Sequence, residues 1–147
     1  MNSDFKDLLQ IFSDEQVKYL VVGAYAVIHY TQPRYTKDID IWIKPSVENA
    51  QRVAQAFKKF GIPLIEVSQS DFESEGLQYV IGVPPCQIDF LTSLPGPMDL
   101  SQAWENRSTQ HSDGIEIQFL SKPDLITAKQ IAGRPQDLAD LDELNWI

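Results

Sequence analysis

The hydrophobic residues of this chain fall into short stretches that alternate between helical spacing and strand-like runs. The first stretch has the period of an amphipathic helix, which Ser3 can cap. Its apolar positions lie at i, i+3, i+4 and i+7 and are Phe5, Leu8, Leu9 and Phe12. An unbroken apolar run at Tyr19–Val22 stops at Gly23, which is typical of a buried strand that turns directly into a helix.

The rest of the chain continues this alternation. Further helices are expected over 24–30, 46–61, 99–107, 121–132 and 135–144, and further strands over 37–43, 77–83, 86–92 and 115–120. Residues 109–114 have the composition of a turn, and the strands on either side of Pro84-Pro85 are expected to form a hairpin. This order predicts an α/β fold in which helices pack against a small mixed β-sheet. No linker or repeat interrupts residues 1–147, so we expect one domain.

The strand at 37–43 carries charge in an unusual place. Isoleucines occupy one face, whereas Asp38, Asp40 and Trp42 share the other, because alternate residues of a strand point the same way. Two carboxylates so close repel each other unless a cation lies between them. Two interpretations stay open, a solvated face of an edge strand or a metal site. Two interpretations also stay open for Trp42, which could stack on a base or fill the core.

Two further features favour a site that handles phosphate. Asp89 lies within a second apolar strand and adds a third carboxylate if the two strands are neighbours, which would make a ligand set for magnesium. Gly23 lets the backbone approach a ligand closely, and the helix that follows presents free N–H groups to an anion.

Composition limits the classes of protein that fit. The 12 Lys and Arg residues against 21 Asp and Glu residues give a formal net charge of −9. This balance argues against coating nucleic acid by bulk electrostatics, although a local patch can still hold a nucleic-acid substrate. Cys86 is the single cysteine, which excludes an intrachain disulfide. With no signal-peptide pattern and no apolar run near the roughly 20 residues of a membrane span, we expect a soluble, cytoplasmic protein.

Together these motifs resemble the nucleotidyltransferase superfamily of the DNA polymerase β type. Val22-Gly23-Ala24 matches its glycine turn, Asp38-Ile39-Asp40-Ile41 its paired acids thirteen residues later, and Ile88-Asp89-Phe90 its third acid. Residues 19–43 and the C-terminal stretch 120–141 look most like the small prokaryotic branch related to AbiEii-type toxins.

The resemblance implies a Mg²⁺-dependent enzyme that moves a nucleoside monophosphate from an NTP to a hydroxyl group of an RNA, a protein or a small molecule. It also implies the setting of a toxin–antitoxin pair, with an antitoxin protein as partner. Two Mg²⁺ ions would be held by the catalytic acids Asp38, Asp40 and Asp89, of which Asp89 would also help to activate the acceptor hydroxyl. The residues implied for nucleotide binding are Gly23, Ala24, Arg34, Thr36, Lys129 and Asp137.

One departure from the family pattern opens an alternative function. Ala24 stands where the family has Gly or Ser, so a hydroxyl that could bond a phosphate is missing. The alternative is a binding or partner module with the nucleotidyltransferase fold and weak or no catalysis. Structural interpretations also stay open for Arg34 as a loop residue in water, for Lys129 as a partner of the helix dipole, and for the acids of 135–144, Asp137 among them, as a solvated helix face.

Overall fold

A computed structural model describes residues 1–32, 36 and 38–146 of the chain, the side chain of Trp146 excepted. In these residues the α-helices are α1 (Ser3–Asp14), α2 (Gly23–Tyr30), α3 (Val47–Phe60), α4 (Leu100–Glu105), α5 (Lys122–Ala132) and α6 (Pro135–Trp146). The strands are β1 (Tyr19–Val22), β2 (Asp38–Ile43), β3 (Gln78–Ile81), β4 (Gln87–Leu91), β5 (Ser108–Ser112) and β6 (Ile115–Phe119), and a 3₁₀ helix, η1, spans Gln69–Glu73. None of the described helices has the length and apolar character needed to cross a membrane.

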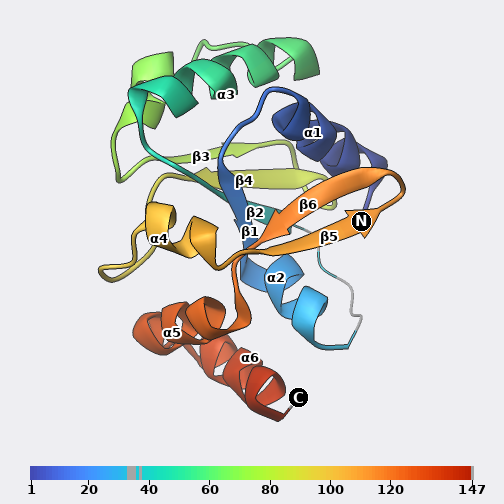
Figure 1. Ribbon diagram of the computed structural model, residues 1–147, viewed down its shortest axis with the longest axis vertical. Helices are drawn as coiled ribbons and strands as arrows, with labels where there is room; N and C mark the ends of the chain where they lie inside the picture. The colour runs from blue at the N-terminus through green and yellow to red at the C-terminus, as the bar shows by residue number, and fades with distance from the viewer. Residues whose placement is uncertain (33–35, 37, 147) are drawn as a thin grey trace.

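The strands form one mixed sheet in the order β3-β4-β2-β1-β6-β5. The central strand β1 is antiparallel to β2 and parallel to β6, β2 is parallel to β4, and each edge of the sheet is an antiparallel hairpin. Figure 1 shows α1 and α3 on one side of the sheet and α2, α5 and α6 on the other. The predicted α/β class with a small mixed sheet is therefore confirmed.

The isoleucine face of β2 is buried under α1 and α3. Ile39 and Ile41 have no solvent exposure. An aromatic cluster lies on the same side, with ring centroids 6.2 Å apart for Phe12 and Phe90 and 5.0 Å apart for Phe57 and Phe90. Burying this apolar face is a main source of stability, and it fixes the opposite face of β2 as the one that carries the aspartates.

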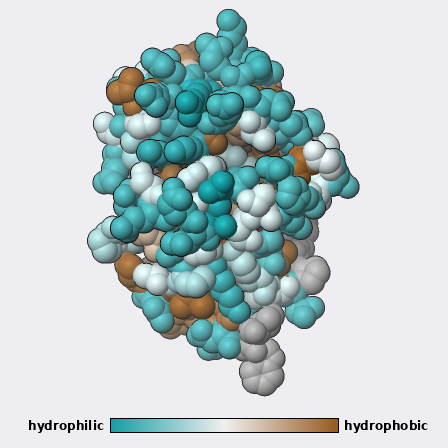
Figure 2. Space-filling model, viewed as in Figure 1, coloured by the Kyte–Doolittle hydropathy of each residue, from teal (hydrophilic) through white to brown (hydrophobic). Residues whose placement is uncertain are grey.

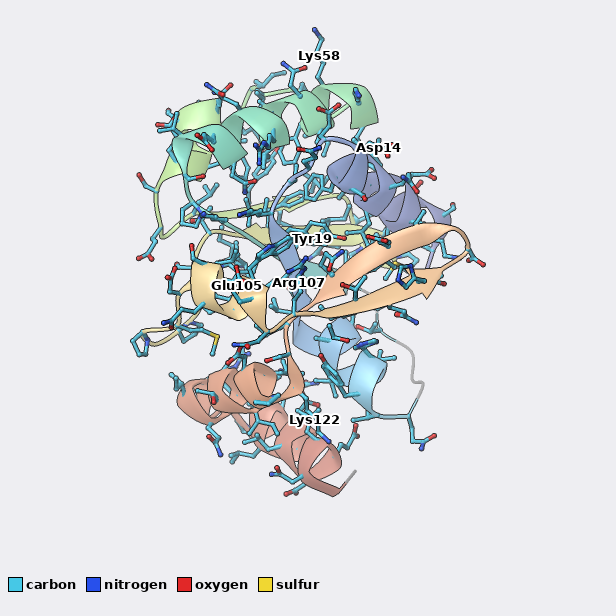
Figure 3. All side chains as sticks on the ribbon, in the orientation of Figure 1. Asp14, Tyr19, Lys58, Glu105, Arg107 and Lys122 are labelled. Carbon is cyan, nitrogen blue, oxygen red and sulfur yellow. The ribbon has the colours of Figure 1, made fainter. Side chains whose placement is uncertain are left out.

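Tyr19 links strand β1 to the neighbouring strand β6 from inside the molecule (Figure 3). Its side chain is buried, and its hydroxyl oxygen accepts a hydrogen bond of 3.2 Å from the backbone N–H of Gln118 on β6. Burial raises the pKa of Tyr19 to about 12.

The structure differs from the sequence predictions in two local features. Strand β5 occupies residues that were expected to form a turn. The expectation was wrong because all five side chains of β5 are polar, which fits a strand at the edge of the sheet that is exposed along much of its length. Helix α1 is capped by Asn2 rather than by Ser3, since the Asn2 side chain accepts a hydrogen bond of 2.9 Å from the N–H of Phe5.

Candidate active site

Asp40 and Asp89 lie directly opposite each other on the parallel strands β2 and β4. The same register places Asp38 opposite Gln87, so all three aspartates lie on the face of the sheet turned away from the isoleucine core. Strands β2 and β4 are thus neighbours. This was the condition for Asp89 to add a third carboxylate to the pair on β2. The side-chain amide of Gln87 donates a hydrogen bond of 3.3 Å to Asp89 Oδ1.

The electrostatics of this pair favour a bound proton or a cation. Burial raises the pKa of Asp40 to about 7, with further contributions from a hydrogen bond to Asp89 and from the charges of Asp89 and Asp38. The positive charge of Lys129 acts in the opposite direction. A cation between the carboxylates would oppose both the burial and the repulsion that keep the proton on Asp40.

The Gly23 turn lies against this pair. Gly23 has φ +67°, and a Cβ atom there would stand only 2.1 Å from Asp40 Oδ2. Helix α2 starts at this glycine, and no side chain of the described residues caps it at Val22. Ala24 follows, half-buried in the first turn. The first N–H groups of α2 therefore remain available to an anion that lies beside Asp40.

A buried ion-pair cluster joins α5 to α6. Lys129 Nζ lies 3.1 Å from Asp137 Oδ1 and 3.0 Å from Asp140 Oδ2, and both aspartates are at most 1% exposed. Arg134 donates to Asp137 through its Nε at 2.7 Å and through its backbone N–H at 3.1 Å. These bonds lower the pKa of Asp137 to about 2, with Arg134 as the largest cause. The interpretation of Asp137 as part of a solvated helix face is therefore wrong.

A cleft of about 850 Å³ connects the aspartate pair with this cluster. Its charged lining residues are Asp40, Asp89, Lys129, Arg134 and Asp137, and Gly23 lies at its wall. Most of the other lining residues are apolar and come from the start of β3, the end of β4 and helix α5. The cleft therefore has one acidic end, one ion-paired wall and one apolar wall.

The structure brings five of the predicted site residues to this cleft, namely Gly23, Asp40, Asp89, Lys129 and Asp137. Asp38, Ala24 and Thr36 are half-buried and lie outside its lining, and Arg34 falls outside the described residues.

Two residues of the ion-pair cluster were not predicted as site residues. The sequence resemblance implied Arg34 for nucleotide binding, whereas neither Arg134 nor Asp140 was expected at the site. The available signal was the acidic pair Asp137 and Asp140, spaced for one helix face, together with a lysine on the preceding helix.

Trp42 belongs to the core rather than to the cleft. It is 1% exposed, although it shares a strand face with the aspartates, so it has no surface on which a base could stack. Its Nε1 is buried and has no hydrogen-bond partner among the described residues.

The donor atoms of the aspartates match the preference of Mg²⁺ for oxygen ligands. Asp38 Oδ1 is buried and lacks a hydrogen-bond partner in the described part of the chain, as expected of an oxygen whose partner is an ion. Within residues 1–32, 36 and 38–146, however, no three His, Cys, Asp or Glu side chains are gathered closely enough to hold an ion as they stand. The three aspartates suit Mg²⁺ because they offer oxygen ligands and lie on the same face of the sheet.

Comparisons with known proteins agree on the class of protein. Residues 3–147 match the family described as "Nucleotidyltransferase of unknown function (DUF6036)", and the chain belongs to this family. No curated protein matches it. Among solved structures, the chain is similar to the lincomycin-bound crystal structure of the lincosamide antibiotic adenylyltransferase LnuA, with a TM-score of 0.57 and 16% sequence identity over 99% of this chain and 96% of that chain.

The protein is therefore a nucleotidyltransferase, and its resemblance to that superfamily is confirmed. Neither comparison names the branch related to AbiEii-type toxins, so that finer assignment stays a prediction.

Proposed function

We propose that this protein transfers a nucleoside monophosphate from an NTP to a hydroxyl group, with Mg²⁺ held by Asp38, Asp40 and Asp89. The observation that carries the proposal is the pairing of Asp40 with Asp89 in the cleft, directly against the Gly23 turn. A carboxylate pair beside an uncapped helix N-terminus provides oxygen ligands for a cation and N–H donors for phosphate in one place.

The residues of the chain would divide the reaction between them. The backbone N–H groups at Gly23 and Ala24 would hold the phosphates, and Lys129 would add positive charge near Asp40. The acceptor oxygen forms a bond to the α-phosphorus while the bond to the α–β bridging oxygen breaks, and pyrophosphate leaves with that electron pair. The hydroxyl proton passes to the Asp89 carboxylate. When bound, Mg²⁺ supplies charge stabilisation to the attacking and leaving oxygens.

Protonation of Asp40 couples metal binding to pH. Because the pKa of Asp40 is raised to about 7, the carboxyl group must release a proton to act as a ligand near neutral pH. The proposed activity therefore rises with pH through this range.

Compared with a serine, the alanine at position 24 weakens binding of the nucleotide without removing the proposed metal ligands. A side-chain hydroxyl bonded to a charged phosphate would contribute about 1.5–3 kcal/mol. Alanine keeps the backbone N–H and the helix N-terminus, so we expect weak but real catalysis rather than an inactive module. Further contacts of Arg34 and Thr36 with the triphosphate are part of the proposal.

The biological setting is proposed separately from the chemistry. A toxin role with an antitoxin partner would require a neighbouring gene whose product binds this chain and blocks transfer. Co-purification of the two products, followed by the transfer assay, tests that role.

The direct test is transfer of label from α-³²P-labelled NTPs in the presence of Mg²⁺, with RNA, protein and small-molecule acceptors. We expect transfer to require Mg²⁺, to stop with EDTA and to be lost in Asp40→Asn and Asp89→Asn. Asp142→Asn, which changes an exposed aspartate of α6, is the matched control and should keep full transfer. Full activity of Asp40→Asn would refute the assignment of the site.

A further inference from the structure

We propose that the acceptor is a small, uncharged or cationic alcohol with an apolar face, which binds along the apolar wall of the active-site cleft. This inference rests on the proposed function and names its substrate class. Three features of the cleft carry it: the composition of one wall, the balance of charge, and the position of that wall relative to Asp89.

The apolar wall is formed by two segments that are far apart in sequence. Leu91, Leu94 and Pro95 come from the end of β4 and the loop after it, and Ala128 and Ile131 come from α5. Figure 2 shows apolar side chains at the surface over α5, where Ile131 is 43% exposed. A wall of this kind offers the contacts that an apolar ligand group would cover.

Gly96 allows the two segments to meet at the rim of the cleft. It has φ +94°, and a Cβ atom there would lie 2.7 Å from Ile131 Cδ1. The loop backbone thus packs against the side chain of α5 at a distance that another residue could not reach without displacing Ile131. This contact brings the two sides of the apolar wall together.

The charge of the cleft disfavours a polyanionic acceptor. Its described lining carries the acids Asp40, Asp89 and Asp137 against the bases Lys129 and Arg134. Both bases form ion pairs with Asp137, and Lys129 also pairs with Asp140. An RNA strand needs unpaired cations along its backbone and aromatic surfaces for its bases. The lining residues that the structure describes include no aromatic side chain.

The apolar wall also lies on the same face of the sheet as Asp89, the proposed base. Asp89 and Leu91 are two residues apart on β4 and therefore share one face of the sheet. An apolar group that covers Leu91 would place a hydroxyl on the same molecule within reach of Asp89. The geometry therefore joins acceptor binding to proton removal.

The first experiment compares acceptors of graded apolar size with labelled NTPs and Mg²⁺. The probes are methyl, hexyl and octyl β-D-glucoside below their micelle concentrations, 2-(hexylamino)ethanol as a cationic alcohol, and unfractionated tRNA. We expect kcat/KM to rise about tenfold or more from methyl to octyl glucoside, because each buried CH₂ adds apolar contact. Preferential labelling of tRNA, or equal rates for the methyl and octyl glucosides, would overturn the proposal.

Nucleotide binding separates this proposal from the proposed function. If Mg²⁺-NTP binds but nothing is labelled, saturation-transfer NMR with octyl glucoside and a non-reactive NTP analogue decides the question. Binding of the alkyl chain supports the acceptor class, and no binding refutes it while the nucleotide site stands. If no NTP binds to the chain, the proposed function itself fails.

A pair of isoleucine variants tests the wall directly. Ile131→Gln changes an exposed wall residue, and Ile65→Gln changes a residue that is 83% exposed and lies outside the cleft lining. We expect Ile131→Gln to raise KM for octyl glucoside about fivefold with no change in KM for the NTP, whereas Ile65→Gln matches the unmodified chain. An unchanged KM for octyl glucoside in Ile131→Gln would refute the placement of the acceptor.

Discussion

The α-carbon of Gly23 faces the carboxylate of Asp40 so closely that a methyl group on it would stand 2.1 Å from Oδ2. The glycine of this turn therefore makes room for an acidic side chain of the neighbouring strand. The φ of +67° adds a second reason for glycine at this position, because L side chains rarely adopt that conformation.

Gly23→Ala should abolish nucleotide transfer, because the new methyl group would displace the Asp40 carboxylate. The variant should also lose about 1–2 kcal/mol of stability through its positive φ. Gly114→Ala is the control, since Gly114 has φ +81° and a Cβ atom there would meet nothing within 4 Å. We expect the drop in Tm of Gly23→Ala to be at least as large as that of Gly114→Ala, because only the methyl group at position 23 meets a neighbouring side chain, and we expect loss of Mg²⁺-NTP binding in Gly23→Ala alone. Equal binding in both variants would contradict the close contact with Asp40.

Asp40 should make the stability of the metal-free protein fall as pH rises. The folded state holds the Asp40 proton up to about pH 7, whereas the unfolded chain releases it near its ordinary value of 3.8. The folded state therefore binds more protons between these values, and the free energy of unfolding decreases as pH rises through this window. Asp40→Asn removes the titration and should raise stability at pH 8 by about 1–4 kcal/mol relative to the unmodified chain.

Urea denaturation between pH 4 and pH 8 without metal measures this effect, with Asp142→Asn as the exposed control. Addition of Mg²⁺ should raise the Tm of the unmodified chain at pH 8 and leave that of Asp40→Asn nearly unchanged. A large loss of metal-free stability in Asp40→Asn would mean that Asp40 is a structural hydrogen-bonding residue.

Asp137 should make the free energy of unfolding rise with pH in the acid range, which is the opposite of the effect of Asp40. Its pKa is lowered to about 2, first through Arg134, so its contribution to stability is present above pH 3.8 and is lost as pH falls toward 2. Asp137→Asn should cost about 1–2 kcal/mol at pH 7, because the ion pairs with Lys129 and Arg134 disappear. The cost should shrink at pH 2. Tm values of both proteins at the two pH values measure this change, and a cost that does not depend on pH would refute the ionic origin.

The sequence predicts those parts of the site that depend on local periodicity. Ile39 and Ile41 had to face a core, so the alternation alone placed Asp38 and Asp40 on the opposite face of β2. A strand at 86–92 could be predicted in the same way. Its parallel pairing with β2 could not, because α3, η1 and β3 intervene between the two strands and local spacing carries no information about that crossover.

The polar elements were harder to predict because their environment is not local. Asp137 and Asp140 have the spacing of an exposed helix face, and they are buried because Lys129 approaches them from α5. Strand β5 lacks an alternation of polar and apolar residues, so its sequence gives no strand signal. It forms a strand because its backbone pairs with β6 at the edge of the sheet. In each case a tertiary contact overrides the local pattern.

Ala24→Ser should strengthen nucleotide binding if the start of α2 holds the phosphates. Ala24 is half-buried in the first turn of α2, beside the glycine that contacts Asp40, so a serine hydroxyl there would add one donor to the free N–H groups. A hydrogen bond to a charged phosphate contributes about 1.5–3 kcal/mol, which corresponds to roughly tenfold to hundredfold tighter binding. Ala139→Ser, on the exposed face of α6, is the matched control and should leave the NTP Kd unchanged. Calorimetric titration of each variant with NTP and Mg²⁺ gives the Kd directly. An unchanged Kd in Ala24→Ser, with transfer retained, would place the phosphates away from the α2 N-terminus and leave Lys129 and the metal as their proposed partners.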